Sequence, residues 1–203
     1  GGFGLQFDQT SGYYDNFGSF HLVGTVTNNG DQFLSISLVA GLYAGDGTVL
    51  DASTLSVPFY LGEGESAPFN FEYFSNVNGN SDEAEKLDSY TVQVDPYWTY
   101  EPGTEVVALE TINDDNGNEG DGQWTFRGDV VNTSDQSLSS ATVVVAVYDT
   151  EDNLVATQWV GVYPSGNAIA PGDTNSFEVA LYLDPDLDTT DFNFQTLVQG
   201  YVQ

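Results

Sequence analysis

Apolar side chains recur at every second position in many short runs of this chain. Near the start, Phe3, Leu5 and Phe7 alternate with Gly4 and Gln6, which is the period of a half-buried strand. Val, Thr, Tyr and Phe dominate these runs, and turn-forming residues separate them. The pattern predicts strands at 3–7, 20–27, 34–43, 48–60, 67–74, 89–97, 104–110, 123–131, 139–148, 153–163, 175–183 and 192–202. No helix of ten or more residues is expected, and only 81–88 favours one short helical turn, capped by Ser81.

The strand pattern occurs twice. Gly24 and Gly128 lie 104 positions apart, and the residues around them match at further positions: Val26 with Val130, Asn28 with Asn132, Tyr43 with Tyr148, and Gly64 with Gly172. Solenoid repeats have periods of about 20–50 residues, so this spacing indicates a duplicated domain. Pro102 and Gly103 interrupt the pattern between the copies.

Each copy holds a full set of strands in about 100 residues, which is typical of an antiparallel β-sandwich. The alternative is one larger sheet, and the repeat argues against it. We therefore expect an all-β fold with two tandem immunoglobulin-like β-sandwich domains, at 1–100 and 101–203.

The second copy resembles the FxLYD domain. The resemblance rests on Gly128, Val130, Asn132, Val147-Tyr148-Asp149, Leu154-Val155, Pro171-Gly172-Asp173 and Phe177. The first copy is more divergent, because Ala44 follows Tyr43 and Gly62-Glu63-Gly64-Glu65 replaces Pro-Gly-Asp. Neither copy has a Phe at the start of the motif that names the family. The resemblance implies an immunoglobulin-like sandwich of a secreted or surface protein of archaea or bacteria, and it implies no catalytic residues.

Charge narrows the possible partners. The chain has 31 acidic and 2 basic residues, for a net charge of −29. Nucleic acids and anionic lipid surfaces need basic patches, so both are excluded as partners. Repulsion among the carboxylates is screened at molar salt, where the Debye length is about 3 Å. The composition therefore favours a halophile, and the alternative is an acidic surface in ordinary salt, loaded with calcium. No apolar run reaches the roughly 18 residues that a membrane-spanning helix needs.

The sequence offers no catalytic motif. His21 is the single histidine, and it has no Ser or Cys partner in a recognisable motif, so we expect a structural or exposed role for it. The absence of cysteine excludes disulfides and thiol chemistry. Pairs of carboxylates are expected by chance among so many acids, and they do not identify a glycosidase. We expect a protein that is not an enzyme.

One acidic segment has the composition of a calcium loop. In 113–122 oxygen-bearing side chains alternate with glycines, and the candidate ligands are Asp114, Asp115, Asn116, Asn118, Glu119 and Asp121. The spacing does not match an EF-hand, and the alternative is an acidic hairpin loop. The stretch 184–191 is a weaker candidate of the same kind.

Asn132-Thr133-Ser134 is a glycosylation sequon, although the turn by itself explains the asparagine.

Aromatic residues suggest where a partner binds. Tyr97, Trp98 and Tyr100 form either a sugar-stacking platform or the filling of a joint between two sandwiches. Tyr13, Tyr14 and Phe17 are expected in an exposed loop at 8–18 that docks to another chain. Phe3, Leu5 and Phe7 lie in an N-terminal strand that could be donated to a neighbouring sheet.

Two functions follow. The first is a structural or interaction protein on the cell surface of a halophile, including a subunit of a surface filament that assembles with other protein chains, by self-assembly or strand donation. The second is a surface lipoprotein-type binding module for a sugar, a peptide or Ca²⁺. Assembly in molar salt favours the first, and a monomer with an aromatic-lined pocket favours the second.

Overall fold

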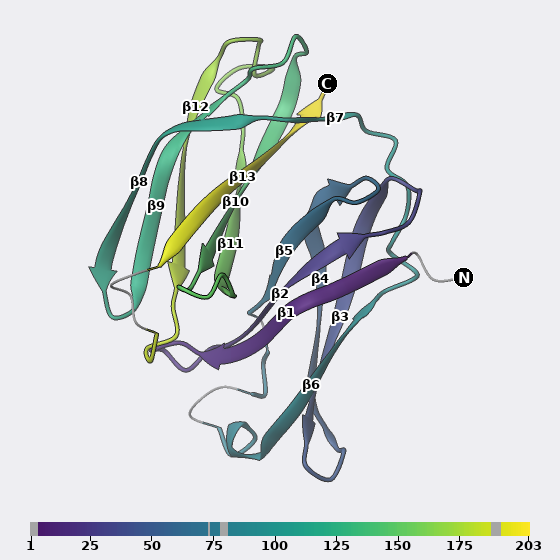
Figure 1. Cartoon of the computed structure of the whole chain (residues 1–203), viewed down its shortest axis with the longest axis vertical. Coiled ribbons are helices and arrows are strands. Elements are labelled where there is room, and N and C mark those ends of the chain that lie inside the picture. Colours follow the sequence, from purple (N-terminus) through teal and green to yellow (C-terminus); the bar gives the residue numbers. More distant parts are fainter. Residues whose placement is uncertain (1–3, 73, 78–80, 188–191) are drawn as a thin grey trace. The chain divides into compact units, whose positions relative to one another are not determined.

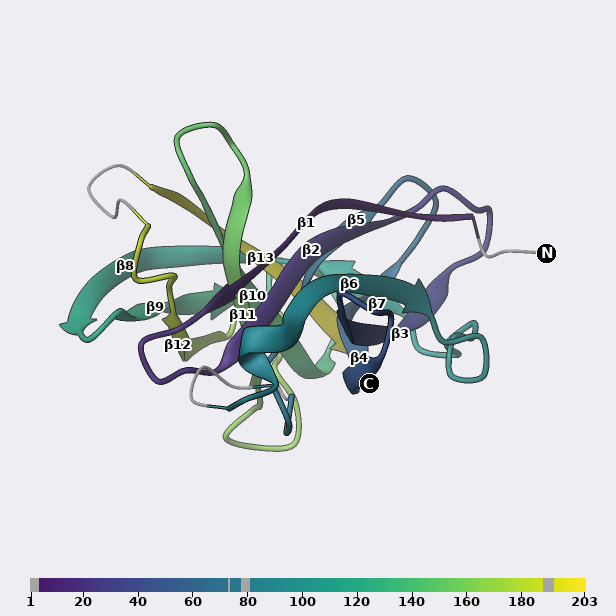
Figure 2. The ribbon, with the colours of Figure 1, turned by 90° about the horizontal axis from the view of Figure 1, so that it is seen from below.

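The computed structural model describes residues 4–72, 74–77, 81–187 and 192–203. Its strands are antiparallel, and the all-β fold with two tandem immunoglobulin-like sandwiches is confirmed (Figures 1 and 2). Contacts divide the chain into unit 1, Gly1–Pro102 with Asp184–Leu187, and unit 2, Gly103–Leu183 with Asp188–Gln203. The division between Pro102 and Gly103 coincides with the break in the sequence pattern.

Unit 1 contains two three-stranded sheets. One sheet has the order β1-β2-β5, and the other has the order β4-β3-β6. The strands are β1 (Leu5–Tyr14), β2 (Phe20–Asn28), β3 (Leu34–Ala44), β4 (Val49–Leu61), β5 (Ser66–Phe71) and β6 (Leu87–Val94). Leu22 and Phe69 from one sheet and Leu38 and Leu42 from the other are buried, so the core lies between the sheets. The expected helical turn is present as a 3₁₀-helix, η1 (Ala84–Lys86), and Ala84 N donates to Ser81 Oγ.

Unit 2 repeats this arrangement with one added strand. Its sheets have the orders β12-β9-β8 and β11-β10-β13-β7. The strands are β7 (Val106–Ala108), β8 (Glu110–Gly120), β9 (Gln123–Val131), β10 (Leu138–Tyr148), β11 (Leu154–Val162), β12 (Thr174–Tyr182) and β13 (Asn193–Val202). Buried Phe126, Val130, Val143 and Val145 contribute to its core. Among the described residues, β7 has no counterpart in unit 1.

The first long strand of each unit is longer than the sequence pattern predicts. The segments 8–18 and 113–122 were expected as loops, but β1 extends to Tyr14 and β8 extends to Gly120. Each strand has a bulge that shifts the register, and the bulge contains a residue of positive φ, Gln9 at 52° and Asn113 at 58°. A bulge breaks the two-residue period, so the alternation stops although the pairing continues. The strand expected at 104–110 is likewise divided between β7 and β8.

The matched asparagines hold equivalent turns. Asn28 Nδ2 donates to the carbonyls of Gln32 and Leu61 at 2.7 and 2.9 Å, and Asn132 Nδ2 donates to those of Gln136 and Ile169 at 2.8 and 2.9 Å. Gly64 N and Gly172 N donate to the backbone carbonyls of the two asparagines. The sequence matches therefore mark the same three-dimensional positions in both units.

Candidate functional site

Three exposed aromatic side chains of unit 1 lie close together in the sequence, just beyond the end of β6. The exposed fractions are 90% for Tyr97, 70% for Trp98 and 54% for Tyr100. Tyr60 of β4 is half-buried, and Ser35 of β3 lies between it and Tyr100, as described below. We call Tyr60, Tyr97, Trp98 and Tyr100 the aromatic platform.

The platform segment is anchored to β3 by its backbone. Asp95 N donates to Ser37 O at 2.8 Å, and Thr99 Oγ1 accepts from Ser37 N at 3.1 Å. Tyr100 and Ser35 exchange both backbone hydrogen bonds, at 2.8 and 3.1 Å. Between these anchors Tyr97 N donates to the Asp95 carboxylate at 2.9 Å, which closes a turn. The aromatic side chains are therefore presented by a fixed bulge.

Unit 2 lacks this bulge. Val94 pairs with Leu38 and Val198 pairs with Val143, so β6 and β13 match up to this point. Residues 95–99 then intervene before Tyr100 pairs with Ser35, whereas only residues 199 and 200 intervene before Tyr201 pairs with Ser140. The strand expected at 89–97 therefore ends at Val94, and the inserted residues include Tyr97 and Trp98.

Two tyrosines flank a small residue across the sheet of unit 1. Ser35 is in register with Tyr60 on one side and with Tyr100 on the other. Residues in register on adjacent strands point to the same face, so Tyr60 and Tyr100 lie on one face with their backbones about 9–10 Å apart and Ser35 between them. Partial burial and the proximity of Tyr100 raise the pKa of Tyr60. Phe33 packs edge-on against Tyr60, with ring centroids 6.1 Å apart.

The single histidine, His21, is buried and contacts Asp15 and Tyr13. His21 is 3% exposed, and its Nε2 lies 3.1 Å from Asp15 Oδ2. Asp15 Oδ1 accepts hydrogen bonds from the backbone of Phe17 and Ser19, and the Tyr13 ring stacks on the imidazole at 4.9 Å. Asp15 thus holds the β1–β2 turn and the histidine together. This geometry places the imidazole in the interior of unit 1.

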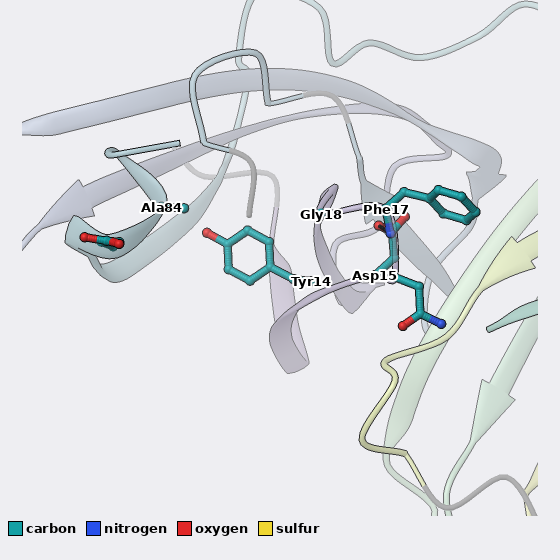
Figure 3. A pocket seen from close by; sticks show the side chains of 7 residues that line it. Tyr14, Asp15, Phe17, Gly18 and Ala84 are labelled. Carbon is teal, nitrogen blue, oxygen red and sulfur yellow. Dashed lines mark hydrogen bonds between the residues drawn. The ribbon is translucent and has the colours of Figure 1, made fainter. Parts of the chain in front are cut away.

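A hollow of about 470 Å³ lies beside this turn, and Figure 3 shows side chains that line it. Tyr14, Asp15, Phe17 and Gly18 line it together with Ala84 and Glu85 of the η1 region. The Tyr14 hydroxyl points toward Ala84, and burial raises its pKa. Of the predicted docking residues here, Phe17 is exposed, Tyr14 is half-buried, and Tyr13 is buried against His21. The structure therefore does not bring the three together as one exposed loop.

The N-terminal segment lies in the sheet of its own unit. Leu5 and Phe7 pair with Asn28 and Val26 of β2, and the Phe7 ring packs edge-on against Phe69. Phe3 lies outside the described residues. In this structure the strand fills a place in unit 1, so donation to another chain would first require its release.

The candidate calcium ligands lie on and beside one hairpin. Asp115 is in register with Arg127 and Asn116 with Phe126, so their side chains point to opposite faces. Glu119 pairs with Arg127 at 3.2 Å, and Asp114 accepts hydrogen bonds from Thr111 and Thr196. Asn118 and Asp121 are exposed near the hairpin end, where Asn118 Oδ1 accepts from Gly120 N. Across the described residues no three acidic or histidine side chains converge in a metal-binding group, and 188–191 of the weaker candidate are not described.

The sequon asparagine is buried. Asn132 is 1% exposed, and its Nδ2, the atom that a glycan would modify, donates two hydrogen bonds. Its Oδ1 accepts from the backbone and hydroxyl of Ser134. The turn accounts for every polar atom of this side chain, and a glycan on the folded unit would break both Nδ2 bonds.

Sequence reasoning missed two residues of these sites. Tyr60 was not associated with 97–100, because only strand register brings it beside Tyr100. Asp15 was one of many acids, and its pairing with His21 depends on the β1–β2 hairpin. The alternation at 57–61, which places Val57, Phe59 and Leu61 inward, was the available signal that Tyr60 faces outward.

Comparisons with known proteins add little. No family model matches the chain, and no curated protein matches it. Solved structures with similar segments include a red sea bream transglutaminase (14% identity, 95% of this chain and 29% of that one, TM-score 0.26). A second is a glycosyl hydrolase family 2 member from Bacteroides cellulosilyticus (12% identity, 91% of this chain and 28% of that one, TM-score 0.29). A third is an Amycolatopsis orientalis exo-chitosanase (17% identity, 97% of this chain and 26% of that one, TM-score 0.26). The chain spans less than a third of each, and similarity this low supports no argument about function. In the described part of the chain, no helix has the length and apolarity to cross a bilayer.

Proposed function

We propose that this chain is a non-enzymatic, extracellular interaction module of a halophile, in which two sandwiches serve as scaffold and unit 1 carries the contact surface. The observation behind this proposal is the anchored aromatic bulge of unit 1, which interrupts a strand that runs on uninterrupted in unit 2. An insertion that exposes a tryptophan and a tyrosine places apolar surface in water, which is unfavourable, and these two rings add nothing to the core. A binding role is the simplest reason for such an insertion.

Three further features support the proposal. The polar groups buried in both units, Asn28, Asn132 and the His21–Asp15 pair, hold turns of the fold. The excess of 31 acidic over 2 basic residues suits a surface exposed to brine. The resemblance to FxLYD domains points to an extracytoplasmic location.

The test is sedimentation of the purified chain with cell envelopes of a halophilic archaeon in molar KCl. We expect co-sedimentation that Trp98→Ala weakens. Val49→Ala is the control, because Val49 is also an exposed apolar residue of unit 1, at 59%, but lies outside the platform. Equal binding of the wild type and the Trp98 variant would argue against the platform as the contact surface.

A filament subunit is the second candidate. Strand β11 is at the edge of its sheet among the described strands, and it exposes Trp159, with Tyr163 just beyond it exposed at 73%. Edge strands with exposed apolar side chains pair readily with other chains. Light scattering in molar KCl tests this reading: ordered polymers that Trp159→Ala abolishes would support it, and a monomer at all concentrations would exclude it.

A further inference from the structure

We infer that the aromatic platform of unit 1 binds an uncharged polysaccharide, by stacking pyranose rings on Trp98 and on the tyrosine rings. This inference rests on the proposed function and names the partner class of the same surface. It is argued from the spacing of the rings, their anchoring and the charge around them.

The spacing suits a sugar chain. Tyr60 and Tyr100 lie on either side of Ser35, two strand spacings apart, which is about 9–10 Å at the backbone. That distance is the span of a disaccharide unit. Ser35, the residue between Tyr60 and Tyr100 in register, has a small polar side chain.

The chemistry of the platform also suits a sugar. One face of a pyranose presents C–H groups, and its edges present hydroxyls. Aromatic rings offer an apolar surface, and the tyrosine hydroxyls provide a polar edge. The Asp95 carboxylate, which accepts from Tyr97 N, belongs to the same segment, and Ser35 lies in register between Tyr60 and Tyr100, so both supply oxygen atoms that can accept hydrogen bonds from sugar hydroxyls.

Anchoring lowers the entropic cost of binding. Ser35 and Ser37 together make backbone or side-chain hydrogen bonds to Asp95, Thr99 and Tyr100, on both sides of the exposed rings. Thr99, between Trp98 and Tyr100, is only 6% exposed. A segment held in this way needs little ordering when a ligand binds.

Charge decides against other partners. The chain has only two basic side chains, and Lys86 and Arg127 each pair with glutamate, so an anionic polymer finds no complementary site. A cationic ligand would be attracted to the acidic residues all along the chain, of which the platform segment 95–100 contains only Asp95. A second copy has the same charge of −29, and protein interfaces of standard size need about 800 Å² of continuous surface per partner. Four rings separated by Ser35 and Thr99 suit a narrow, uncharged chain better.

The experiment is calorimetric titration of the full chain in molar KCl with three uncharged oligosaccharides, cellohexaose, laminarihexaose and mannohexaose, and with an anionic hyaluronan hexasaccharide. We expect binding of at least one uncharged sugar, no binding of hyaluronan, and a Kd that changes less than twofold between 1 and 3 M KCl. Trp98→Ala and Tyr100→Ala should each weaken binding at least tenfold, and Val49→Ala should leave it unchanged. Circular dichroism checks that the variants remain folded.

Absence of binding by all three uncharged sugars, or equal losses in Trp98→Ala and Val49→Ala, would overturn the inference. Self-association that Trp98→Ala abolishes, without sugar binding, would identify a second copy as the occupant and leave the proposed function intact. If Trp98→Ala changes neither sugar binding, self-association nor envelope binding, the platform is not a contact surface and the proposed function fails as well.

Discussion

Replacing the buried turn asparagine should destabilise each unit by a similar amount. In Asn28→Ala, the carbonyls of Gln32 and Leu61 lose their Nδ2 donor, and Gly30 N loses its acceptor at 3.0 Å. Three hydrogen bonds at about 1 kcal/mol each predict a loss of about 3 kcal/mol in the free energy of unfolding. The buried Leu61 carbonyl, left without this donor, would increase the loss.

Asn132→Ala removes the equivalent contacts in unit 2, so the same loss of about 3 kcal/mol is expected there. Calorimetric unfolding in molar KCl measures both variants. For a domain of this size 1 kcal/mol shifts Tm by about 4–8 °C, so the transition of the altered unit should fall by roughly 12–24 °C. Asn28→Asp tests the direction of the bonds, because it replaces the donor with an acceptor that faces two carbonyls.

Two control variants distinguish a loss of stability caused by the turn hydrogen bonds from one caused by a missing glycan. Asn29→Ala removes an exposed neighbour and should change stability by less than about 0.5 kcal/mol. Ser134→Ala destroys the sequon but leaves both Nδ2 bonds of Asn132, so a loss of only about 1 kcal/mol is expected. Losses below 1 kcal/mol in both asparagine variants would refute the reasoning. A large loss at Asn132 with none at Asn28 would point to a role of Asn132 beyond the turn.

Four further outcomes are expected. Asp15→Ala should lower the free energy of unfolding by about 3 kcal/mol in denaturant titrations, because two backbone N–H groups and the buried imidazole lose their acceptor; an unchanged midpoint would contradict this. Gly24→Ala and Gly128→Ala should each cost about 1–3 kcal/mol by thermal unfolding, because the added methyl group meets a phenylalanine ring at 2.6 and 2.7 Å, whereas Gly103→Ala, which meets nothing within 4 Å, should be tolerated. Burial and the nearby Asp15 carboxylate raise the pKa of Tyr13. The neutral phenol therefore contributes fully to the free energy of unfolding below pH 10, the ordinary tyrosine value, and this contribution is lost as pH rises above it. In alkaline unfolding, the free energy of unfolding of Tyr13→Phe should fall less steeply with pH than that of the wild type. Dialysis from molar KCl into dilute buffer without divalent ions should lower Tm as screening of the −29 charge is lost, and an unchanged Tm would count against the halophile.

Local sequence information was sufficient for much of the fold. Alternating apolar residues identified most strands, and matches such as Gly24 with Gly128 and Asn28 with Asn132 identified the duplication. These features could be recognised because each strand must bury one face, and because a turn of fixed geometry tolerates few residue types. The same logic failed at the bulges of β1 and β8, where a residue of positive φ interrupts the period without ending the strand.

The sites depended more on contacts between distant segments. Tyr97, Trp98 and Tyr100 were recognised as a group, because they are adjacent in the sequence. Tyr60 joins them only because β3 places Ser35 between Tyr60 and Tyr100.

By itself, the sequence determined that this protein is an acidic, duplicated, all-β chain, since composition, alternation and repetition are properties of the chain read in order. Only the tertiary structure decided which acids and aromatics are available to a partner. It buried Tyr13 and Asp15 around His21, spread the candidate calcium ligands over two faces of a hairpin, and left Trp98 exposed on an anchored bulge. The physical reason is that exposure and neighbourhood depend on strand register and sheet pairing, which join residues far apart in the sequence.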